Sequence, residues 1–354
     1  MNSPITQSDS YVLHGSKDLR FEGERALPEA KDSDVIVAVE RVGICGSDLH
    51  YIEHGRCGAF APNRPFVLGH EFSGKVVWSG SSASKVSVGD RVAVMPLLYC
   101  GECSHCLQGR TNICEHAKFF GSARVSATDG AYSKYVVAPA RNCHHIPDRL
   151  GFDIAALLEP LAVCMHAANR AGDLRYRSVL VIGGGPIGQL IAMIARSGGA
   201  SVVAVSDVRQ EPLKFAKENS ADATLNPTDP NFLQEANKVS GGGFDVIIDA
   251  SGAPRAIVQA FDLIRRGGTL VQVGTLSEDP KIPWNLVMTQ ELNVIGSFGF
   301  PDLFDDAIEL AASGKLPLAQ LVSRVYPFRE LPGAVEAATG GDVVKVQVDV
   351  SDAA

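Results

Sequence analysis

One glycine-rich turn constrains the fold of this chain more than any other segment. An apolar run, Ser178 to Ile182, leads directly into the sequence GGGPIG, and a helix-like stretch follows to Ser197. Glycines at Gly183, Gly185 and Gly188 have the spacing that turns a strand sharply into a helix and brings backbone N–H groups to a pyrophosphate. An acidic residue, Asp207, ends the next apolar run, where a ribose-binding carboxylate is expected. The segment predicts a dinucleotide-binding βαβ unit.

The length and spacing of the apolar runs change along the chain. Between residues 11 and 145, short apolar runs are broken by Gly, Pro, Ser and Asp, which predicts many short strands. From residue 177 onward, strand-like and helix-like runs alternate, as in a doubly wound parallel sheet. A chain of 354 residues is long enough for two cores. We expect an α/β protein with a β-rich domain of residues 1–155 and 301–354 and a doubly wound domain of residues 156–300.

The composition of the chain limits the kinds of molecule that we expect it to bind. The net charge of −8 argues against nucleic acid and anionic membranes, which attract basic surfaces, and favours small molecules. No apolar stretch is long enough to span a bilayer, and the first ten residues are polar, so we expect a cytoplasmic protein. Eight cysteines are unusual in a reducing compartment unless some of them bind metal.

Four of the cysteines form a compact motif. They follow the pattern C-x2-C-x2-C-x7-C within YCGECSHCLQGRTNIC and are Cys100, Cys103, Cys106 and Cys114. Four thiolates on a turn-rich loop can enclose one tetrahedral zinc ion, which makes a closed, structural site. An iron–sulfur cluster is the rival, but its fourth cysteine usually follows after three residues and precedes a proline, which this chain lacks. Unrelated free thiols are the remaining alternative.

A second metal site is indicated by scattered residues. Cys45 lies in VGICGSDLHY, His70 and Glu71 lie in GHEFSG, and Glu159 is an acidic residue inside the apolar run LLEPLAV. A catalytic zinc needs about three such ligands and one open position. Taken singly, each has a simpler interpretation: a core cysteine, a hydrogen-bonded histidine, or a glutamate that caps a helix.

The motifs together resemble those of the zinc-containing medium-chain dehydrogenases. GHEFSG, VGICGSDLHY, the four-cysteine loop and GGGPIG occur in the family's order over nearly the whole chain, and EPLAV resembles the polyol (sorbitol and xylitol) dehydrogenase branch. The resemblance implies a GroES-like catalytic domain, a Rossmann domain and two zinc ions per chain. It also implies a catalytic zinc held by Cys45, His70 and an acidic group, with Glu71 and Glu159 as candidates for direct or water-mediated contact.

The resemblance also implies a proton path. Ser47 matches the position that accepts the proton of the substrate hydroxyl, and His50 matches the one that passes it to solvent. A histidine suits this role because an ordinary imidazole exchanges protons near neutral pH. Glu159 stands among the catalytic candidates as well. The alternative is that Ser47 and His50 only satisfy the backbone of a turn.

The cofactor choice depends on Asp207 and its neighbour. A carboxylate at this position accepts hydrogen bonds from the ribose hydroxyls of NAD and repels the additional phosphate of NADP. Arg209 could offset that repulsion, so NAD is favoured and NADP stays open. By family position, the nicotinamide and ribose contacts are expected at Ile187, Val273, Gly274 and Thr275.

We expect the enzyme to oxidise a secondary alcohol of a sugar acid or polyol to a ketone, with L-idonate as the first candidate substrate. The stretch KFFGSARVSATDGAYSKYVV, together with EPLAVCMHAA, resembles bacterial L-idonate 5-dehydrogenases, which act on a sugar acid. Relatives place an arginine where this chain has Gly299, and Arg56 is an alternative partner for a carboxylate. A neutral polyol such as sorbitol, xylitol or galactitol is the rival. The expected substrate contacts are Tyr51, Arg56 and Phe119.

Two further expectations concern assembly and class. The resemblance implies a homotetramer or homodimer, paired through the strand at residues 292–297. The alternative to an enzyme is a protein of another class, a nucleotide-binding sensor that is stabilised by structural zinc and catalyses no reaction. It is disfavoured because a sensor does not need the proton path and open metal site that Cys45, Ser47, His50, His70 and Glu159 suggest.

Overall fold

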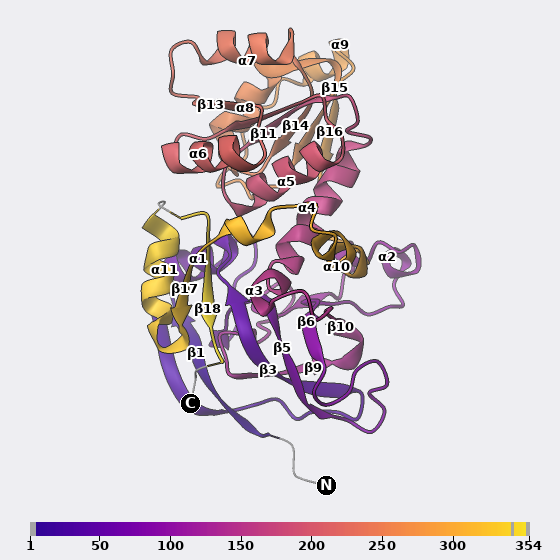
Figure 1. Cartoon of the computed structure of the whole chain (residues 1–354), viewed down its shortest axis with the longest axis vertical. Helices are drawn as coiled ribbons and strands as arrows, with labels where there is room; N and C mark the ends of the chain where they lie inside the picture. Colours follow the sequence, from indigo (N-terminus) through magenta and orange to yellow (C-terminus); the bar gives the residue numbers. More distant parts are fainter. Residues whose placement is uncertain (1–4, 341–342, 352–354) are drawn as a thin grey trace. The chain divides into compact units, whose positions relative to one another are not determined.

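The computed structural model describes residues 5–340 and 343–351, which form two compact units (Figure 1). Of the described residues, unit 1 contains 5–159, 304–314, 318–340 and 343–351, and unit 2 contains 160–303 and 315–317. The chain passes from unit 1 to unit 2 within helix α4 (Leu158–Ala171) and returns near residue 304. In the described ranges, no helix has the length and apolar character needed to cross a membrane.

Unit 1 is built mainly of short, antiparallel strands. Its largest sheet has the order β10-β6-β5-β3-β18-β17, with β9 also paired to β3, and smaller sheets join β2-β1-β4 and β7-β8. The strands are β1 (Gln7–Gly15), β2 (Asp18–Ala26), β3 (Asp34–Gly43), β4 (Phe66–Val67), β5 (Glu71–Ser79), β6 (Arg91–Val94), β7 (Leu97–Leu98), β8 (Lys118–Phe119), β9 (Tyr135–Pro139), β10 (Cys143–His145), β17 (Val322–Pro327) and β18 (Lys345–Asp349). The central strand β3 is buried along most of its length because it pairs with β5, β9 and β18.

Short helices connect these strands. They are α1 (Gly46–His54), α2 (Ser104–Leu107), η1 (Thr111–Ile113), η2 (Ala140–Asn142), α3 (Phe152–Ala155), α10 (Phe304–Ala312), η3 (Leu318–Leu321), η4 (Phe328–Glu330) and α11 (Leu331–Gly340). Apolar side chains from β1, β3, β5, β6, β9 and β18 form the core of the unit, together with aromatic residues of the loops. The core thus fixes the ends of β3 and β5, from which the site residues project.

Unit 2 is a doubly wound parallel sheet. Its strand order is β13-β12-β11-β14-β15-β16, and all neighbouring pairs are parallel. The strands are β11 (Ser178–Ile182), β12 (Val202–Ser206), β13 (Ala223–Leu225), β14 (Phe244–Asp249), β15 (Ile264–Gln272) and β16 (Asn293–Gly296). The helices are α5 (Pro186–Ser197), α6 (Gln210–Asn219), α7 (Phe232–Ser240), α8 (Pro254–Leu263) and α9 (Trp284–Thr289). This strand order is that of a Rossmann sheet and confirms the predicted fold class.

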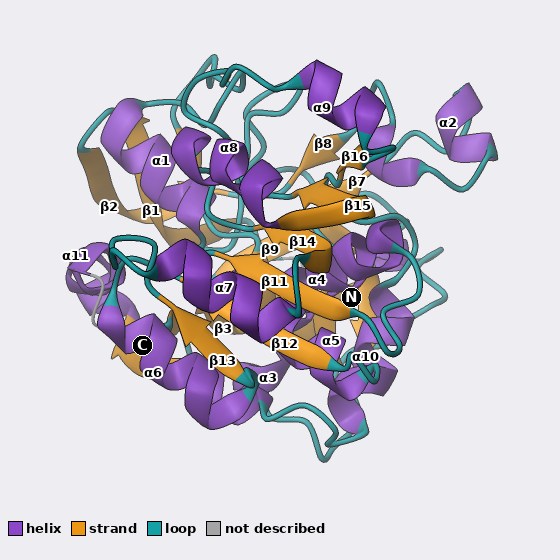
Figure 2. Ribbon diagram, turned by 90° about the horizontal axis from the view of Figure 1, so that it is seen from above, coloured by secondary structure: helices purple, strands orange, loops and turns teal. Residues whose placement is uncertain are grey.

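The helices of unit 2 cover both faces of its sheet. Helices α5 and α6 pack together on one face, and α7 and α8 pack together on the other (Figures 1 and 2). The central strands are buried on both sides, which explains why they are continuous apolar runs without alternation. The order reverses between β11 and β14, and ligands of such sheets bind at that point.

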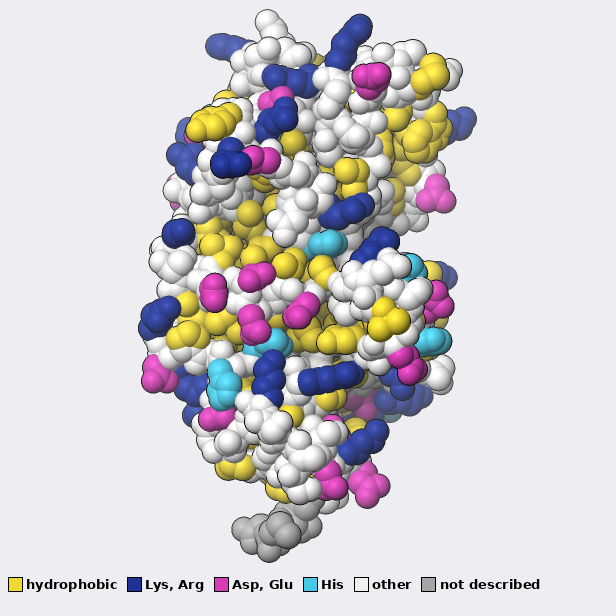
Figure 3. All heavy atoms as spheres, turned by 90° about the vertical axis from the view of Figure 1, so that its right-hand side faces the viewer, with side chains coloured by type: hydrophobic (Ala, Val, Ile, Leu, Met, Phe, Trp, Pro, Cys, Tyr) yellow, Lys and Arg dark blue, Asp and Glu magenta, His cyan; other side chains and the backbone are white. Residues whose placement is uncertain are grey.

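One face of the protein mixes both signs of charge. On the face drawn in Figure 3, acidic and basic side chains are interspersed, with hydrophobic side chains scattered between them. Single exposed apolar side chains are normal on a globular protein. That face therefore gives no argument for a large charged partner.

Candidate metal and nucleotide sites

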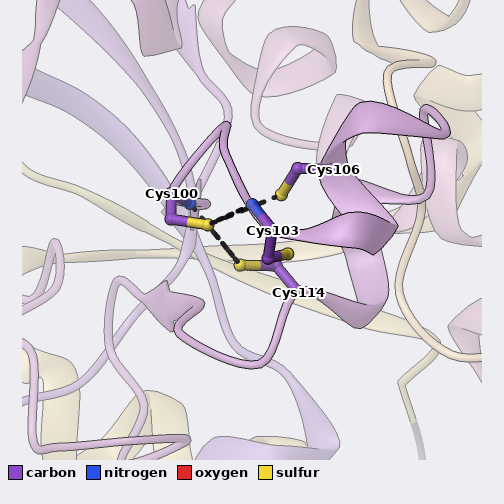
Figure 4. Close-up of side chains that lie close together, drawn as sticks. All are labelled: Cys100, Cys103, Cys106 and Cys114. Atoms are coloured by element: carbon purple, nitrogen blue, oxygen red, sulfur yellow. Dashed lines mark hydrogen bonds between the residues drawn. The ribbon is translucent and has the colours of Figure 1, made fainter.

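The four-cysteine motif closes into one cluster in unit 1. The sulfur atoms of Cys100, Cys103, Cys106 and Cys114 all lie within 4.8 Å of one another, and the four side chains converge from one loop (Figure 4). None is in a disulfide bond. Four unpaired thiols held this closely fit a tetrahedral metal ion, because thiolates would repel one another without one. The donor set fits zinc.

Backbone groups support this loop. The N–H of Cys103 points at the Cys100 sulfur, 3.4 Å away, and backbone donors from Glu102 and Cys103 lower the pKa of the Cys100 thiol to about 6. The thiolate, the form that binds metal, is thereby favoured. Arg124 donates to the carbonyl oxygens of Asn112 at 2.8 Å and Cys114 at 3.4 Å, which fastens the end of the loop to the domain.

A second cluster lies where three elements of unit 1 meet. Cys45 immediately precedes α1, His70 lies between β4 and β5, and Glu71 begins β5. Their donor atoms also lie within 4.8 Å of one another, and His70 and Glu71 are buried. The turn before His70 requires glycine: Gly69 has φ +88°, and a Cβ there would lie 2.6 Å from the ring of Tyr132.

Asp48 organises this cluster and is absent from the sequence prediction. Its buried carboxylate accepts hydrogen bonds from the N–H of Cys45 at 2.9 Å and the hydroxyl of Tyr132 at 3.1 Å. It also lies 3.6 Å from Nδ1 of His70, an ion-pair distance. Burial opposes a charged imidazole, but Asp48 and Cys45 raise the pKa of His70 well above its usual value. The cluster therefore attracts positive charge, as a metal site must.

Lys345 is a second residue that the sequence prediction missed. It lies on β18, is almost completely buried, and forms an ion pair with Glu71. Its ammonium also donates to the carbonyl of Ile44 at 2.9 Å. Burial disfavours the ammonium, but Glu71, Cys45 and Glu159 outweigh burial and raise the pKa of Lys345. The pair leaves no room for a side chain at Gly43, where a Cβ would lie 2.1 Å from the carboxylate of Glu71.

Glu159 lies near the cluster in the first turn of α4. It is buried, and burial raises the pKa of its carboxyl to about 7; Glu71 adds to this rise and His70 opposes it. Among the described residues, the group with donor atoms within 4.8 Å contains Glu71 and does not contain Glu159. The geometry thus favours Glu71 as the direct ligand and Glu159 as a neighbour of the site.

The other predicted residues of this region have different surroundings. Ser47 and His50 lie on α1, with Ser47 half-buried and His50 exposed. Phe119 stacks edge-on against His70, with ring centroids 5.5 Å apart. Tyr51 is buried in the core, and its hydroxyl accepts the N–H of Ala123 at 2.9 Å, which favours a packing role over substrate contact.

Arg56 lies in the loop after α1 and forms hydrogen bonds within that loop. Its guanidinium donates twice to the carbonyl of Gly58, from Nε at 2.8 Å and from Nη2 at 2.6 Å. The side chain is exposed. The hydrogen bonds of Arg56 are thus made to its own loop.

A pocket in unit 2 lies at the glycine-rich turn. It has a volume of about 330 Å³ and is lined by Gly183, Gly185, Asp207, Arg209 and residues of the loop after β14. Glycine at position 188 is required by close packing, because a Cβ there would lie 1.7 Å from the carbonyl oxygen of Gly183. The turn and the first N–H groups of α5 thus face an open space, the arrangement that binds a pyrophosphate.

Asp207 and Arg209 meet at the edge of this pocket. The carboxylate of Asp207 accepts the N–H of Gly184 at 2.8 Å and lies 3.3 Å from Nε of Arg209. The N–H groups of Val273 and Gly274 donate to the backbone carbonyl of Asp249, at 2.9 and 3.0 Å. These bonds hold the loop that contains Thr275. Ile187 lies in the first turn of α5, where its carbonyl accepts the thiol of Cys164 at 3.4 Å.

Comparisons with known proteins agree with these sites. Residues 31–148 match the model of the alcohol dehydrogenase GroES-like domain, and residues 186–313 match that of the zinc-binding dehydrogenases. D-xylulose reductase A of Aspergillus oryzae is 37% identical over 97% of this chain and 96% of its own length.

Solved structures give the same family. L-idonate 5-dehydrogenase of Escherichia coli K-12 has a TM-score of 0.90 and 34% identity over 97% of this chain and 98% of that one. A Sinorhizobium meliloti structure assigned to the zinc-binding dehydrogenases, solved with NADP bound, has a TM-score of 0.89 and 32% identity over 97% and 99%. These relatives are dehydrogenases or reductases, so the alternative of a non-catalytic sensor is set aside. The chain belongs to the zinc-binding medium-chain dehydrogenases, in the branch of zinc-dependent polyol dehydrogenases.

Proposed function

We propose that this enzyme oxidises a secondary alcohol of a linear polyol to a ketone, with zinc held by Cys45, His70 and Glu71 and with NAD as the electron acceptor. The observation that carries the proposal is the close cluster of one half-buried thiol, one buried imidazole and one buried carboxylate. Such a donor set, with three protein ligands, leaves a position for a substrate oxygen. The four-cysteine loop has no such role, because its four thiols complete a tetrahedron.

The protein's own residues supply orientation and proton transfer. When bound, zinc provides a Lewis acid for the substrate hydroxyl and the nicotinamide provides a hydride acceptor. Ser47, two residues after Cys45, accepts the hydroxyl proton and releases its own hydroxyl proton toward His50. His50, one turn along the same helix and exposed, passes that proton to water. The carboxylate of Asp48 lies 3.6 Å from Nδ1 of His70 and orients the imidazole ring, as the partners of metal-binding histidines do.

The chemistry around the site favours a neutral substrate over a sugar acid. A carboxylate needs a cationic partner, but Arg56 donates to Gly58 of its own loop, and Gly299 offers no side chain. Lys345 is buried and paired with Glu71. The likeness to D-xylulose reductase supports xylitol as the substrate, whereas the likeness to L-idonate 5-dehydrogenase supports L-idonate as the second candidate.

Steady-state kinetics with xylitol, sorbitol, galactitol, L-idonate and D-gluconate test this choice, each with NAD and with NADP. We expect kcat/KM for xylitol to exceed that for L-idonate by at least about tenfold, a difference of about 1.4 kcal/mol in transition-state binding. A preference of the same size for L-idonate would reject the neutral polyol and leave the dehydrogenase assignment unchanged.

Replacement of Asp207 tests the cofactor proposal. The carboxylate repels the additional phosphate of NADP, and like charges placed together cost several kcal/mol. We therefore expect Asp207→Ser to lower the ratio of kcat/KM for NAD to that for NADP by at least about tenfold. The matched variant Arg209→Ser should raise this ratio, because it removes the cation that pairs with Asp207. An unchanged ratio in both variants would contradict the role of the pair.

We also infer that the enzyme is a homo-oligomer, a dimer or tetramer, that pairs through β16. This strand ends the sheet, and its residues Asn293, Val294 and Gly296 are exposed. Two large apolar side chains of the preceding helix, Trp284 and Met288, are 63% and 68% exposed. An open edge beside exposed apolar side chains is suited to extension of the sheet by a second copy.

Charge introduced beside this edge tests the inference. Met288→Lys should raise the dissociation constant of the oligomer at least about tenfold, because a buried unpaired ammonium is costly. Val88→Lys, at a position that is 62% exposed in unit 1, is the matched control and should have no effect. Light scattering over a dilution series measures both. A wild-type monomer at all concentrations would reject the inference.

A further inference from the structure

Helix α1 carries two histidines on its exposed side. His50 and His54 are one helical turn apart, both are exposed, and their ring centroids are 5.8 Å apart with the ring planes inclined by 38°. Residues four apart lie on the same face of a helix. Among the residues that the structure describes, neither ring has a hydrogen bond or an ion pair to another side chain, so both are free to bind a ligand.

The pair has the chemistry of a metal chelate. Imidazole nitrogen suits zinc, copper and nickel, and two histidines at i and i+4 are a recurrent way to hold such an ion on a helix. The local sequence, HYIEH, is an H-x-x-E-H pattern, which occurs in helices that bind zinc. Glu53 is thus adjacent to the pair and offers an oxygen donor. Its exposed ion pair with Lys17, at 2.7 Å, is of the weak surface kind that a cation can displace.

The backbone under the pair is held in place. Asp48 accepts the N–H of Cys45 at the start of α1, and Tyr51, between the two histidines in the chain, is buried in the core. The helix ends at Gly55, which has φ +68° and donates its N–H to the carbonyl of Tyr51 at 2.8 Å. A rigid helix keeps the two imidazoles close together before an ion arrives, which lowers the entropic cost of chelation.

We propose that His50 and His54 form a surface site for a divalent transition-metal ion, separate from the two zinc clusters, and that an ion bound there inhibits the enzyme. The inhibition rests on the proposed function of His50. A proton relay needs one ring nitrogen to accept the proton and the other to release it to water. A metal ion on either nitrogen of His50 occupies a lone pair or blocks the exit, so proton transfer from Ser47 stops.

Calorimetric titration of the zinc-loaded enzyme with ZnCl2 tests the binding site. We expect one additional zinc ion per chain in the wild type. In His54→Gln, its affinity should fall by about 10–100-fold or more, since loss of a direct ligand costs at least as much as loss of a partner that supports one. His145→Gln removes another exposed imidazole, on β10, and is the matched control; it should keep the wild-type affinity. Equal affinity in wild type and His54→Gln would overturn the site.

Inhibition by the same salt tests the link to turnover. The ZnCl2 concentration that halves the rate should rise in His54→Gln by the factor found for binding and stay unchanged in His145→Gln. Without added zinc, His54→Gln should turn over like the wild type. If binding is lost in His54→Gln but inhibition persists, the inhibitory role is overturned. The variant His50→Gln tests the proposed proton path by itself. Full turnover in His50→Gln would show that the proton path fails, which is a different outcome from persistent inhibition in His54→Gln.

Discussion

Replacing Cys45 by alanine should remove one of two zinc ions per chain and lower kcat/KM by at least about a thousandfold. The thiol is one of the three donors that the described part of the chain brings together here, so its loss leaves an imidazole and a carboxylate that hold the ion poorly. The Lewis acid contributes several kcal/mol to the reaction, and about 4 kcal/mol corresponds to a factor of about a thousand. Metal analysis and steady-state kinetics on the same sample measure both effects.

Two other cysteine variants make this result specific. Cys57→Ser alters a half-buried thiol outside both metal groups, so it should retain both zinc ions and the wild-type rate. Cys103→Ala removes a thiol of the other cluster, so it should also lose one zinc ion, but with a fall in thermal stability. Full zinc content and normal turnover in Cys45→Ala would remove this cysteine from the catalytic site.

The parts of the protein that were predictable from sequence have local determinants. The four cysteines and the glycine-rich turn each lie within one short segment, and spacing alone indicates their geometry. The sheet of unit 2 was predictable because apolar runs of strand length alternate with helical ones. In each case the residues that must meet in space are already neighbours in the chain.

The residues that were missed depend on contacts between distant segments. Lys345 reaches Glu71 only because β18 pairs with β3, and β3 pairs with β5. Its one sequence signal was a lysine within the apolar run VVKVQV. Asp48 was recognisable in principle, since it lies three residues before Tyr51 on one face of α1 and that face is buried. Periodicity would have assigned Tyr51 to the core and His50 to the surface.

Replacing Lys345 by methionine should lower the free energy of unfolding by roughly 3–5 kcal/mol. This is the usual cost of removing one partner of a buried ion pair, because the other charge is left without compensation. Methionine has a similar length, so the loss reflects charge more than volume. Glu71 would remain in a site where Lys345 is 2% exposed and Glu71 is 1% exposed. Urea unfolding of the zinc-loaded enzyme measures the loss. The matched control is Lys75→Met, whose ion pair with Glu40 is 2.8 Å long and half-exposed at the lysine; it should cost less than about 1 kcal/mol.

The double variant Lys345→Met/Glu71→Gln separates the ion pair from the metal site. Removing both charges should restore most of the stability lost in Lys345→Met, because no unpaired charge is then buried. Activity should not return, since a neutral amide replaces the carboxylate that lies with Cys45 and His70. Recovery of both stability and turnover would mean that Glu71 serves only to balance Lys345, and Glu159 would then be the acidic ligand. Additive losses of stability in the two single variants would instead show that the two side chains are not coupled.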